Sequence, residues 1–518
     1  MENEGYDVIN FDEKNLALLF SHNIHGETHP CGCRHFPLGG LAQVAGQIEK
    51  IKKDHNIIYV DSGDTLFDST KIPDTLKQSR IYNAKGLAKG LSDVGLNYWT
   101  PGDYDFANGV DFIAQMAKEH KFHILVSNLR SPKTFPHKEF VVIEKGPHRI
   151  FLTGVIHPSV FNDDNRNLFM APEASIPKLL EKIKKVGFKE NDPFHRLVLV
   201  SHSGKDNDDL IAKKFPQITW IIGAHTQNFY REAQEVNKTK IVQVLSRNHY
   251  FGQVTFDLTK DKSGDSYQIH EIRDELKDEL KPNPFTTYIN DHKNKLKEVR
   301  IKEQELMVTG GDHIKYSTAK ACLDCHEPQA HFWQGTSHAT AYATLIKSGE
   351  ENNLTCVKCH SLGLSDVKGF SRVKDIIEVD KDSYKKTTEA AAKEKYWNSV
   401  RKAFTPVKSI RKLNTNKRRA LAQTWDKLDS KHGINRNFAN VQCLNCHTKH
   451  DNHPWDNLQK DKAQASHTDS MKKKCLECHN PDQSPEWYDK KPNGIPGDLN
   501  QDALNKKFKE ISCPKRLD

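Results

Sequence analysis

The chain has 518 residues, 36% of them hydrophobic, and a formal net charge of +9 at pH 7. Domains average about 150 residues, so this length excludes a single ordinary core and predicts roughly two to four structural units. No apolar run approaches the roughly 20 residues of a bilayer-spanning helix, so we expect no transmembrane segment.

The first half alternates short apolar strands with amphipathic helices, which predicts an α/β domain. The expected strands are 16–20, 57–61, 123–127, 150–155, 197–201, 219–223 and 240–245. The expected helices are 40–53, 110–120, 176–186 and 207–215. Polar side chains follow several of the strand ends, where loops over a sheet carry functional groups. We therefore expect a functional site at one edge of this sheet.

Residues 261–306 are highly charged, and the stretches 271–280 and 288–305 favour helices. We expect this segment to be a charged helical connector between an N-terminal domain, residues 1–260, and a C-terminal domain, residues 307–518. The C-terminal domain shows little strand pattern and is predicted to be mostly α. Within it, residues 380–432 form a basic insert that we expect to be a solvated helical spacer.

The sequence Cys-x-x-Cys-His occurs four times in the C-terminal half and uses eight of the eleven cysteines. Each copy supplies two thioether anchors and a proximal imidazole for one haem. Paired Cys-x-x-Cys sequences also form zinc sites, but zinc does not require a His directly after the second Cys. The sequence therefore predicts four c-type haems, bound through Cys322, Cys325 and His326; Cys356, Cys359 and His360; Cys443, Cys446 and His447; and Cys475, Cys478 and His479.

The haem half contains an internal repeat, because a His-x-Trp and a later Ser-His lie between the first two motifs and again between the last two. The repeat predicts two dihaem modules, each offering distal imidazoles to its own or its neighbour's iron. His338 and His467 are the first distal candidates, since their context repeats. The further candidates are His313, His432, His450 and His453. Two imidazoles on an iron favour electron transfer, whereas an open sixth position binds small molecules.

Through the stretch from Trp333 to Ala339 and the paired haem motifs, residues 307–480 resemble the multihaem cytochromes related to the tetrahaem electron carriers of hydroxylamine oxidation. This resemblance implies closely stacked haem pairs with bis-His coordination. Covalent haem attachment takes place outside the bacterial cytoplasm in most systems. We therefore expect a periplasmic or otherwise exported protein from which a signal peptide has been removed.

Five short polar motifs follow the strands of the first half: Asn23-Ile24-His25-Gly26, Asp61-Ser62-Gly63-Asp64, Gly102-Asp103-Tyr104-Asp105, Ser201-His202-Ser203-Gly204 and Gly223-Ala224-His225-Thr226-Gln227. Imidazoles and carboxylates on successive loops can hold two divalent ions with one carboxylate between them. A single His-Gly or Ser-His pair is more often structural, so this prediction depends on the five motifs together.

With these motifs, residues 14–258 resemble the calcineurin-like metallophosphoesterases, specifically the 5′-nucleotidase branch. The segments Gly39-Gly40-Leu41-Ala42 and Ser127-Asn128-Leu129 also fit that family. The resemblance implies a four-layer α/β/β/α sandwich that holds one or two divalent ions, such as Mn, Zn or Fe. It assigns His25 and Gln227 to the first metal, Asp64 to the bridge between the metals, and His202 and His225 to the second metal.

Two departures from that family concern the metal site. Its Asp-x-His opening is Asn23-Ile24-His25 here, so a neutral amide replaces an anionic ligand and binds a hard cation more weakly. Asp103 can still bind metal, but Tyr104 replaces the His that stabilises the leaving group, and a Tyr with a pKa of about 10 stays neutral. Tyr104 and Asp105 are the catalytic candidates of this loop. The family's C-terminal substrate domain is absent, so ordinary nucleotidase activity is not expected.

Cys31 and Cys33, separated by one Gly, lie on the loop after His25. Such a pair can cycle between dithiol and disulfide and release two electrons that haems accept one at a time. Some nucleotidase-like sequences that this chain resembles carry a similar pair, which implies redox chemistry. A structural disulfide or a pair of metal ligands is the alternative interpretation.

Haem propionates offset much of the positive charge. The excess Lys residues are therefore expected to face propionates or to attract an acidic redox partner protein, and no nucleic acid is expected to bind. The whole sequence predicts electron transfer to or from a metal or Cys-Gly-Cys site that acts on a small sulfur-containing or other inorganic anion. The alternatives are a phosphoester or thiosulfonate hydrolase with accessory haems, and an electron carrier whose first domain is only a scaffold.

Overall fold

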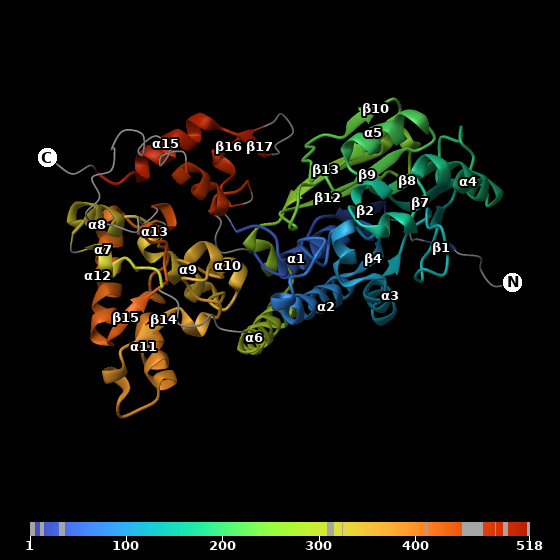
Figure 1. Ribbon diagram of the computed structural model, residues 1–518. Helices are drawn as coiled ribbons and strands as arrows, with labels where there is room; N and C mark the ends of the chain where they lie inside the picture. Colours follow the sequence, from blue (N-terminus) through green and yellow to red (C-terminus); the bar gives the residue numbers. More distant parts are fainter. Residues whose placement is uncertain are drawn as a thin grey trace. The chain divides into compact units, whose positions relative to one another are not determined.

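The computed structural model describes residues 6–10, 15–30, 37–307, 315–323, 325–410, 412–447, 470–481, 483–490 and 496–514. The chain divides into two compact units, the first built mainly from residues up to Leu296 and the second from Lys297 onwards (Figure 1). The boundary falls within helix α6 (Pro284–Glu305). None of the helices in the described ranges is long and apolar enough to cross a membrane.

The first unit contains two mixed β-sheets. One has seven strands in the order β1 (Tyr6–Asn10), β6 (Phe140–Lys145), β7 (His148–Ile156), β8 (His195–His202), β9 (Trp220–Gly223), β11 (Thr239–Val242) and β10 (Gln234–Val236). The other has six strands in the order β13 (Ser266–Glu271), β12 (Tyr250–Phe256), β2 (Leu16–Ser21), β3 (Asn56–Asp61), β4 (Leu96–Trp99) and β5 (His123–Ile124).

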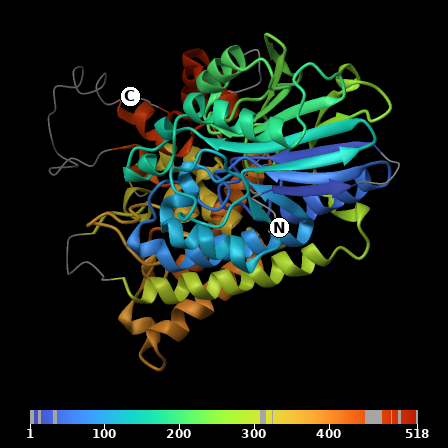
Figure 2. The same cartoon turned by 90° about the vertical axis from the view of Figure 1, so that its right-hand side faces the viewer.

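Strand β2 shows why the sheets stack. Its side chains point alternately to the two faces, and both faces are buried, so every residue from Leu16 to Ser21 is covered. Leu16, Leu18 and Phe20 join a hydrophobic cluster shared by both sheets. Ala17 and Leu19 join a second cluster with the helices on the other face. Figure 2 shows the strands of this unit in stacked layers.

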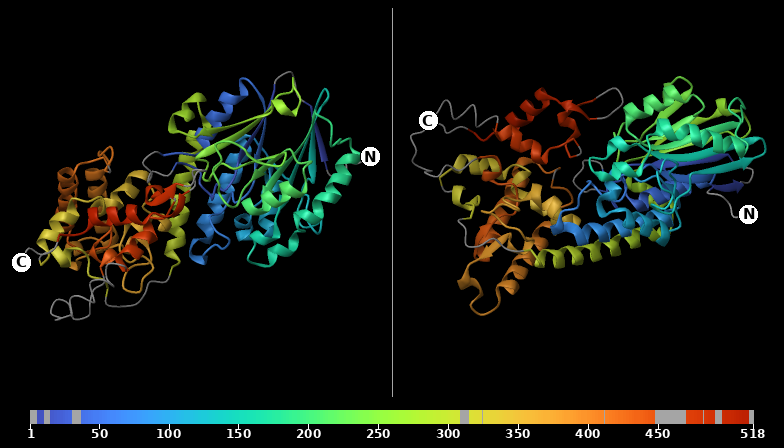
Figure 3. Two further views of the ribbon diagram at one scale, coloured as in Figure 1. Left: turned by 90° about the horizontal axis from the view of Figure 1, so that it is seen from above. Right: turned by 45° about the vertical axis from the view of Figure 1, so that its right-hand side comes forward.

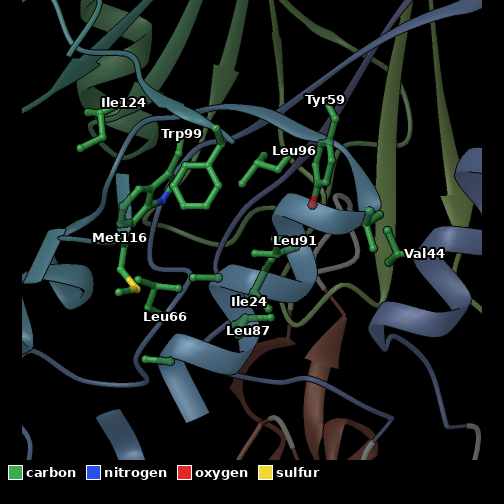
Figure 4. Close-up of a cluster of buried hydrophobic side chains, with 14 of the residues drawn as sticks. Ile24, Val44, Tyr59, Leu66, Leu87, Leu91, Leu96, Trp99, Met116 and Ile124 are labelled. Carbon is green, nitrogen blue, oxygen red and sulfur yellow. The ribbon is translucent and has the colours of Figure 1, made fainter. Parts of the chain in front are cut away.

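Helices cover the outer faces of both sheets. α1 (Leu41–Lys52), α2 (Lys77–Val94) and α3 (Val110–Glu119) pack on the six-stranded sheet. α4 (Pro172–Lys185) and α5 (Lys205–Lys214) pack on the seven-stranded sheet. The predicted α/β/β/α sandwich is therefore confirmed. Figure 4 shows Leu87 and Leu91 of α2 in one hydrophobic cluster with Ile24. Ile24 lies between Asn23 and His25, so its packing holds this loop against the core.

The expected connector at 261–306 is not separate from the first unit. Residues 266–271 form strand β13, which pairs antiparallel with β12, and residues 274–279 form a short 3₁₀ helix in place of an α-helix. The N-terminal part of α6 packs on α2, where the Tyr288 hydroxyl donates to the Gly86 carbonyl at 2.7 Å. Only Tyr267 and Ile269 of this edge strand pack on the core, and the polar residues between and around them concealed the strand in the sequence.

A buried ion pair fastens this segment to the sheet. Arg196 is fully buried, and its guanidinium donates to the Asp265 carboxylate at 2.7 to 3.0 Å. The Trp220 indole also donates to Asp265, at 3.4 Å. Arg196 lies near the start of β8 and His202 ends that strand, so the ion pair is at the opposite end of β8 from the polar motif that contains His202.

We expect Arg196→Met to destabilise the first unit by about 3–5 kcal/mol, because it leaves the Asp265 carboxylate buried without its partner. Denaturant unfolding followed by far-ultraviolet circular dichroism measures the loss. The double variant R196M/D265L removes both charges and should recover much of the stability. A loss below about 1 kcal/mol, typical of exposed pairs, would contradict the assignment.

The second unit is mostly helical (Figure 3). Its helices are α7 (Lys320–Leu323), α8 (Glu327–Gln334), α9 (Ala341–Ser348), α10 (Leu354–His360), α11 (Glu389–Phe404), α12 (Thr415–Lys431), α13 (Cys443–Cys446), the stretch 470–478, and α15 (Gln501–Ile511). Two short two-stranded ribbons join β14 (Ile377–Val379) to β15 (Ile434–Asn437) and β16 (Tyr488–Lys490) to β17 (Pro496–Leu499).

The insert at 380–432 is helical as expected, but it is not a solvated spacer. Tyr396, Val400 and Phe404 of α11 and Trp425 of α12 lie in the hydrophobic cluster of this unit. The Tyr396 hydroxyl also donates to Asp429 at 2.6 Å. Basic residues cover the outer faces of these helices, so the charge count hid their apolar faces.

Candidate metal centre and haem-binding motifs

The polar motifs of the first unit converge at one edge of the two sheets. Asn23 and His25 follow β2, Asp64 follows β3, and Asp103 follows β4. On the other sheet His202 ends β8 and His225 follows β9. These strands pair in parallel within each sheet, so their carboxyl ends lie on the same side. Loops at such an edge are the usual position for a site in an α/β fold.

The backbone of these loops is unusual. Positive φ angles occur at five non-glycine residues of the motifs: Asn23 (50°), His25 (57°), Asp64 (56°), His225 (68°) and Gln227 (52°). Each such residue costs of order 1–3 kcal/mol, and residues of this kind cluster at functional sites because the surrounding structure enforces them. No local pattern of residue types indicates this strain.

Four side chains form a compact cluster. One ligand atom each from Asp64, Asp103, His202 and His225 lies within 4.8 Å of the others. Asp103 Oδ1 is 3.2 Å from His202 Nε2 and 3.0 Å from His225 Nδ1. His202 Nε2 is also 3.5 Å from Asp64 Oδ1. The sequence predicted all four residues as ligands, and the structure brings them together.

His202 is oriented for metal binding. Its ring is fully buried, and its Nδ1 lies 2.7 Å from the Ser62 carbonyl oxygen. A carbonyl oxygen only accepts, so Nδ1 carries a hydrogen, and Nε2, which faces the two carboxylates, is the nitrogen available to bind a metal. Metal-binding histidines commonly donate their second nitrogen to a carbonyl in this way.

The electrostatics of the two carboxylates differ. Burial disfavours ionisation of Asp103, but hydrogen bonds and charge from His202 and His225 hold the pKa of Asp103 well below its usual range. Burial, reinforced by the charge of Asp103, raises the pKa of Asp64 well above its usual range. A divalent cation between them would supply the positive charge that stabilises both in the ionised form. The donor set of two carboxylates and two imidazoles therefore fits a divalent transition metal.

The remaining predicted ligands adjoin the cluster. The Asn23 side-chain nitrogen lies 2.9 Å from Asp64 Oδ2 and 3.3 Å from His25 Nε2. Gln227 is half-buried, two residues beyond His225. Cys31 and Cys33 lie outside the described residues.

The two catalytic candidates differ in position. Tyr104 is half-buried beside His25, with ring centres 5.4 Å apart, and burial and neighbouring carboxylates raise the pKa of Tyr104, so its phenol stays neutral. Asp105 is fully buried and accepts backbone N–H groups from Thr65, Leu66 and Gly102 at 2.7 to 2.9 Å. The structure thus gives Asp105 the role of a positioning residue, which its place in the motif did not indicate.

Gly102 is packed against the metal ligands. A Cβ at this position would clash with Asp64 Oδ1 and with the ring of His202. We expect Gly102→Ala to weaken Mn²⁺ binding by about 10–100-fold, the range seen when groups that orient ligands are altered. Gly146→Asn, in the open β6–β7 turn, is the control, because Asn adopts the positive φ of 54° at this position more readily than Ala does. Equal affinities in the two variants, measured by chelator competition, would refute this close packing.

The haem motifs of the second unit lie at helix ends. Cys356, Cys359 and His360 belong to α10, and His360 Nδ1 lies 2.7 Å from the Ala341 carbonyl oxygen. The hydrogen of this ring is therefore on Nδ1, which leaves Nε2 for an iron. His479 Nδ1 lies 2.7 Å from the Ser484 hydroxyl, and the His479 ring stacks on Trp487 at 4.3 Å.

The two predicted dihaem modules are interleaved. His338, between the first and second motifs, is half-buried, and its ring centre lies 6.2 Å from that of His479 in the fourth motif. The Cys443 thiol of the third motif is close enough to Cys322 of the first for that thiol to raise its pKa, and Cys359 of the second motif likewise raises the pKa of Cys478 of the fourth. The four motifs thus form one group within this unit.

Other distal candidates have different outcomes. His432 ends α12, and its described ring contact is with Tyr396, not with a motif histidine. His313, His450, His453 and His467 lie outside the described residues.

A protein-family model matches part of the second unit. The family described as cytochrome c554 and c-prime matches residues 321–383, a range that contains the first two haem motifs. The prediction of a multihaem cytochrome segment is therefore confirmed over this range, and the family implies c-type haem.

The first unit is similar to animal 5′-nucleotidases. Those of Mus musculus and Homo sapiens are 20% and 21% identical over 232 residues, covering 41% of this chain and 38% of each relative. The chain thus spans well under half of these curated relatives. The sulfate thiohydrolase SoxB of Thermus thermophilus aligns with a TM-score of 0.45 and 16% identity, over 55% of this chain and 61% of that chain. The first unit is thus similar to 5′-nucleotidases, as predicted, and it is joined to a region that matches the cytochrome c554 and c-prime family.

Proposed function

We propose that this chain is an exported multihaem redox protein that binds a small inorganic anion at the metal centre of its first unit. Electrons pass between that unit and an acidic partner protein by way of four c-type haems. The observation that carries the proposal is the buried Asp64, Asp103, His202 and His225 cluster in a chain with four haem motifs. Export follows from covalent haem attachment, which takes place outside the cytoplasm.

The chemistry of the metal centre supports anion binding better than efficient hydrolysis. A divalent cation held by the four ligands attracts oxyanions and polarises their oxygen atoms. Tyr104 is a neutral donor where a phosphoesterase of this kind uses an imidazole, so stabilisation of a charged leaving group is weaker.

The proposal assigns His338 and His479 to one haem. Metal–imidazole bonds are about 2 Å long, so two rings on opposite sides of one iron have centres roughly 6 Å apart. The separation of 6.2 Å between the two ring centres fits this arrangement. Such a six-coordinate haem supplies electron transfer.

Cys31 and Cys33 are the proposed source of electrons inside the first unit. Oxidation of this dithiol to a disulfide releases two electrons and two protons, and two ferric haems take up one electron each. The double variant C31S/C33S removes both thiols. It is expected to abolish this transfer of electrons to the haems and to leave metal binding unchanged.

Anaerobic mixing of the ferric protein with thiosulfate or sulfite, followed at the haem α-band, tests the proposal. We expect haem reduction by one of these anions in the wild type and a much slower reaction in His202→Ala. Equal rates in both would contradict a role for the metal centre.

Hydrolysis is the second candidate, because the first unit is similar to 5′-nucleotidases. Manganese-dependent release of phosphate from nucleotides, unaffected by the haem oxidation state, would favour it. A fully metallated sample that releases none would exclude it.

A further inference from the structure

The hydrogen bonds of His22 fix the orientation of the neighbouring Asn23 side-chain amide. The Val244 backbone N–H donates to His22 Nε2 at 2.8 Å, so that nitrogen is an acceptor. The ring hydrogen of His22 is therefore on Nδ1, which lies 2.8 Å from Asn23 Oδ1. The Asn23 oxygen accepts this hydrogen bond, and its NH₂ group faces away from His22.

That NH₂ group faces two atoms that a first metal would need. Its two hydrogens are directed to Asp64 Oδ2 at 2.9 Å and to His25 Nε2 at 3.3 Å. An amide nitrogen is a donor without a lone pair for a cation, so it competes with a cation for the same two acceptors. Asn23 is fully buried, and its oxygen is already occupied by His22, so a flip of the amide would break three hydrogen bonds.

The opposite side of Asp64 keeps a full set of ligands. His202 Nε2 lies 3.5 Å from Asp64 Oδ1, and Asp103 and His225 complete the cluster within 4.8 Å. The cluster contains two carboxylates, and one divalent cation neutralises both. Asp61 and Asp105 are also buried near Asp64, but the oxygens of both carboxylates already accept hydrogen bonds from backbone N–H or hydroxyl groups.

We infer that this centre is mononuclear: Asp64, Asp103, His202 and His225 hold one divalent cation, and the Asn23 amide takes the place of the other. The inference rests on the proposed function only in treating the cluster as a metal centre. Two-metal sites stabilise both the attacking and the leaving oxygen of a displacement. A mononuclear centre supplies only one of these contacts, which favours binding of an anion over its hydrolysis.

Titration of the haem-loaded protein with Mn²⁺, after chelator dialysis, tests this inference. Dithionite reduction removes the ferric haem signals, so electron paramagnetic resonance reports the manganese alone. We expect the wild type to bind one Mn²⁺ per chain with no exchange coupling. Asn23→Asp is expected to bind a second Mn²⁺ and to show an exchange-coupled pair.

Asn207→Asp is the matched control. It adds the same charge in the first turn of α5, where Asn207 donates to the Ser203 carbonyl and contacts no ligand of the cluster. It is expected to bind one Mn²⁺, as the wild type does.

An exchange-coupled pair of ions in the wild type would overturn the mononuclear inference and leave the metal centre itself standing. Absence of any bound Mn²⁺ would overturn both this inference and the proposed function. If N23D fails to fold, the wild-type spectrum alone decides between one ion and two.

Discussion

His202→Ala is expected to weaken divalent metal binding by more than about 100-fold, beyond the effect of losing a group that only orients a ligand. His202 is fully buried, and its Nε2 lies 3.2 Å from Asp103 Oδ1 and 3.5 Å from Asp64 Oδ1. Removing the ring takes away one of the four ligands. The carboxylates of Asp64 and Asp103 then lie close together without the imidazole that contacts both of them. Calorimetric titration of the haem-loaded protein with Mn²⁺ or Zn²⁺ measures the change.

His157→Ala is the control for that experiment. His157 also follows a strand of the seven-stranded sheet, but its Nδ1 contacts the Ser159 hydroxyl at 2.6 Å and not the cluster. We expect this variant to bind metal as the wild type does. Similar losses in both variants would show that general disturbance of the sheet edge, not loss of a ligand, causes the effect.

His338→Gly is expected to convert one haem from six-coordinate low-spin to high-spin and to let its reduced form bind carbon monoxide. The proposed partner of His338 is His479, and removing one imidazole opens the sixth position of that iron. Spectra of the ferric protein and carbon monoxide titration of the reduced protein measure the change.

His331→Gly removes an exposed histidine from the same segment and is expected to leave the spectra unchanged. An unaltered spin state in His338→Gly would show that His338 is not an axial ligand. A change in several haems at once would indicate misfolding of the unit.

Much of the first unit could be predicted, because its central strands are apolar on both faces. The strand at 16–20 and the helix at 40–53 match β2 and α1 closely. Strands β4 and β12 were missed for local reasons. β4 has only four residues, and β12 contains Gly252, where a side chain would clash with the Phe20 ring. A glycine that gives room to an aromatic ring looks like a turn signal in the sequence.

The metal site was predicted in its residues but not in its details. Strand-end positions and residue types predicted a metal site at this edge of the sheet, and the resemblance to the metallophosphoesterases then assigned Asp64, Asp103, His202 and His225 as ligands. The direction of the Asn23 amide depends on the backbone of Val244, which is far away in the sequence. No local pattern contains that information, and the backbone role of Asp105 was hidden for the same reason.

The haem motifs of the second unit could be recognised in the sequence. Which histidines lie close together is seen only in the structure. The repeat predicted two modules that offer imidazoles to their own or their neighbour's iron, and the structure brings His338 of the first repeat close to His479 of the second. Contacts between segments more than a hundred residues apart depend on how α8, α9 and α12 pack, which residue spacing does not specify.

Intact-mass spectrometry of the matured, denatured chain tests the central claim most directly. Thioether-linked haem survives denaturation, so the account predicts a mass increase of four haem groups over the polypeptide, together with Soret absorbance. A colourless chain at the mass of the bare polypeptide would contradict it.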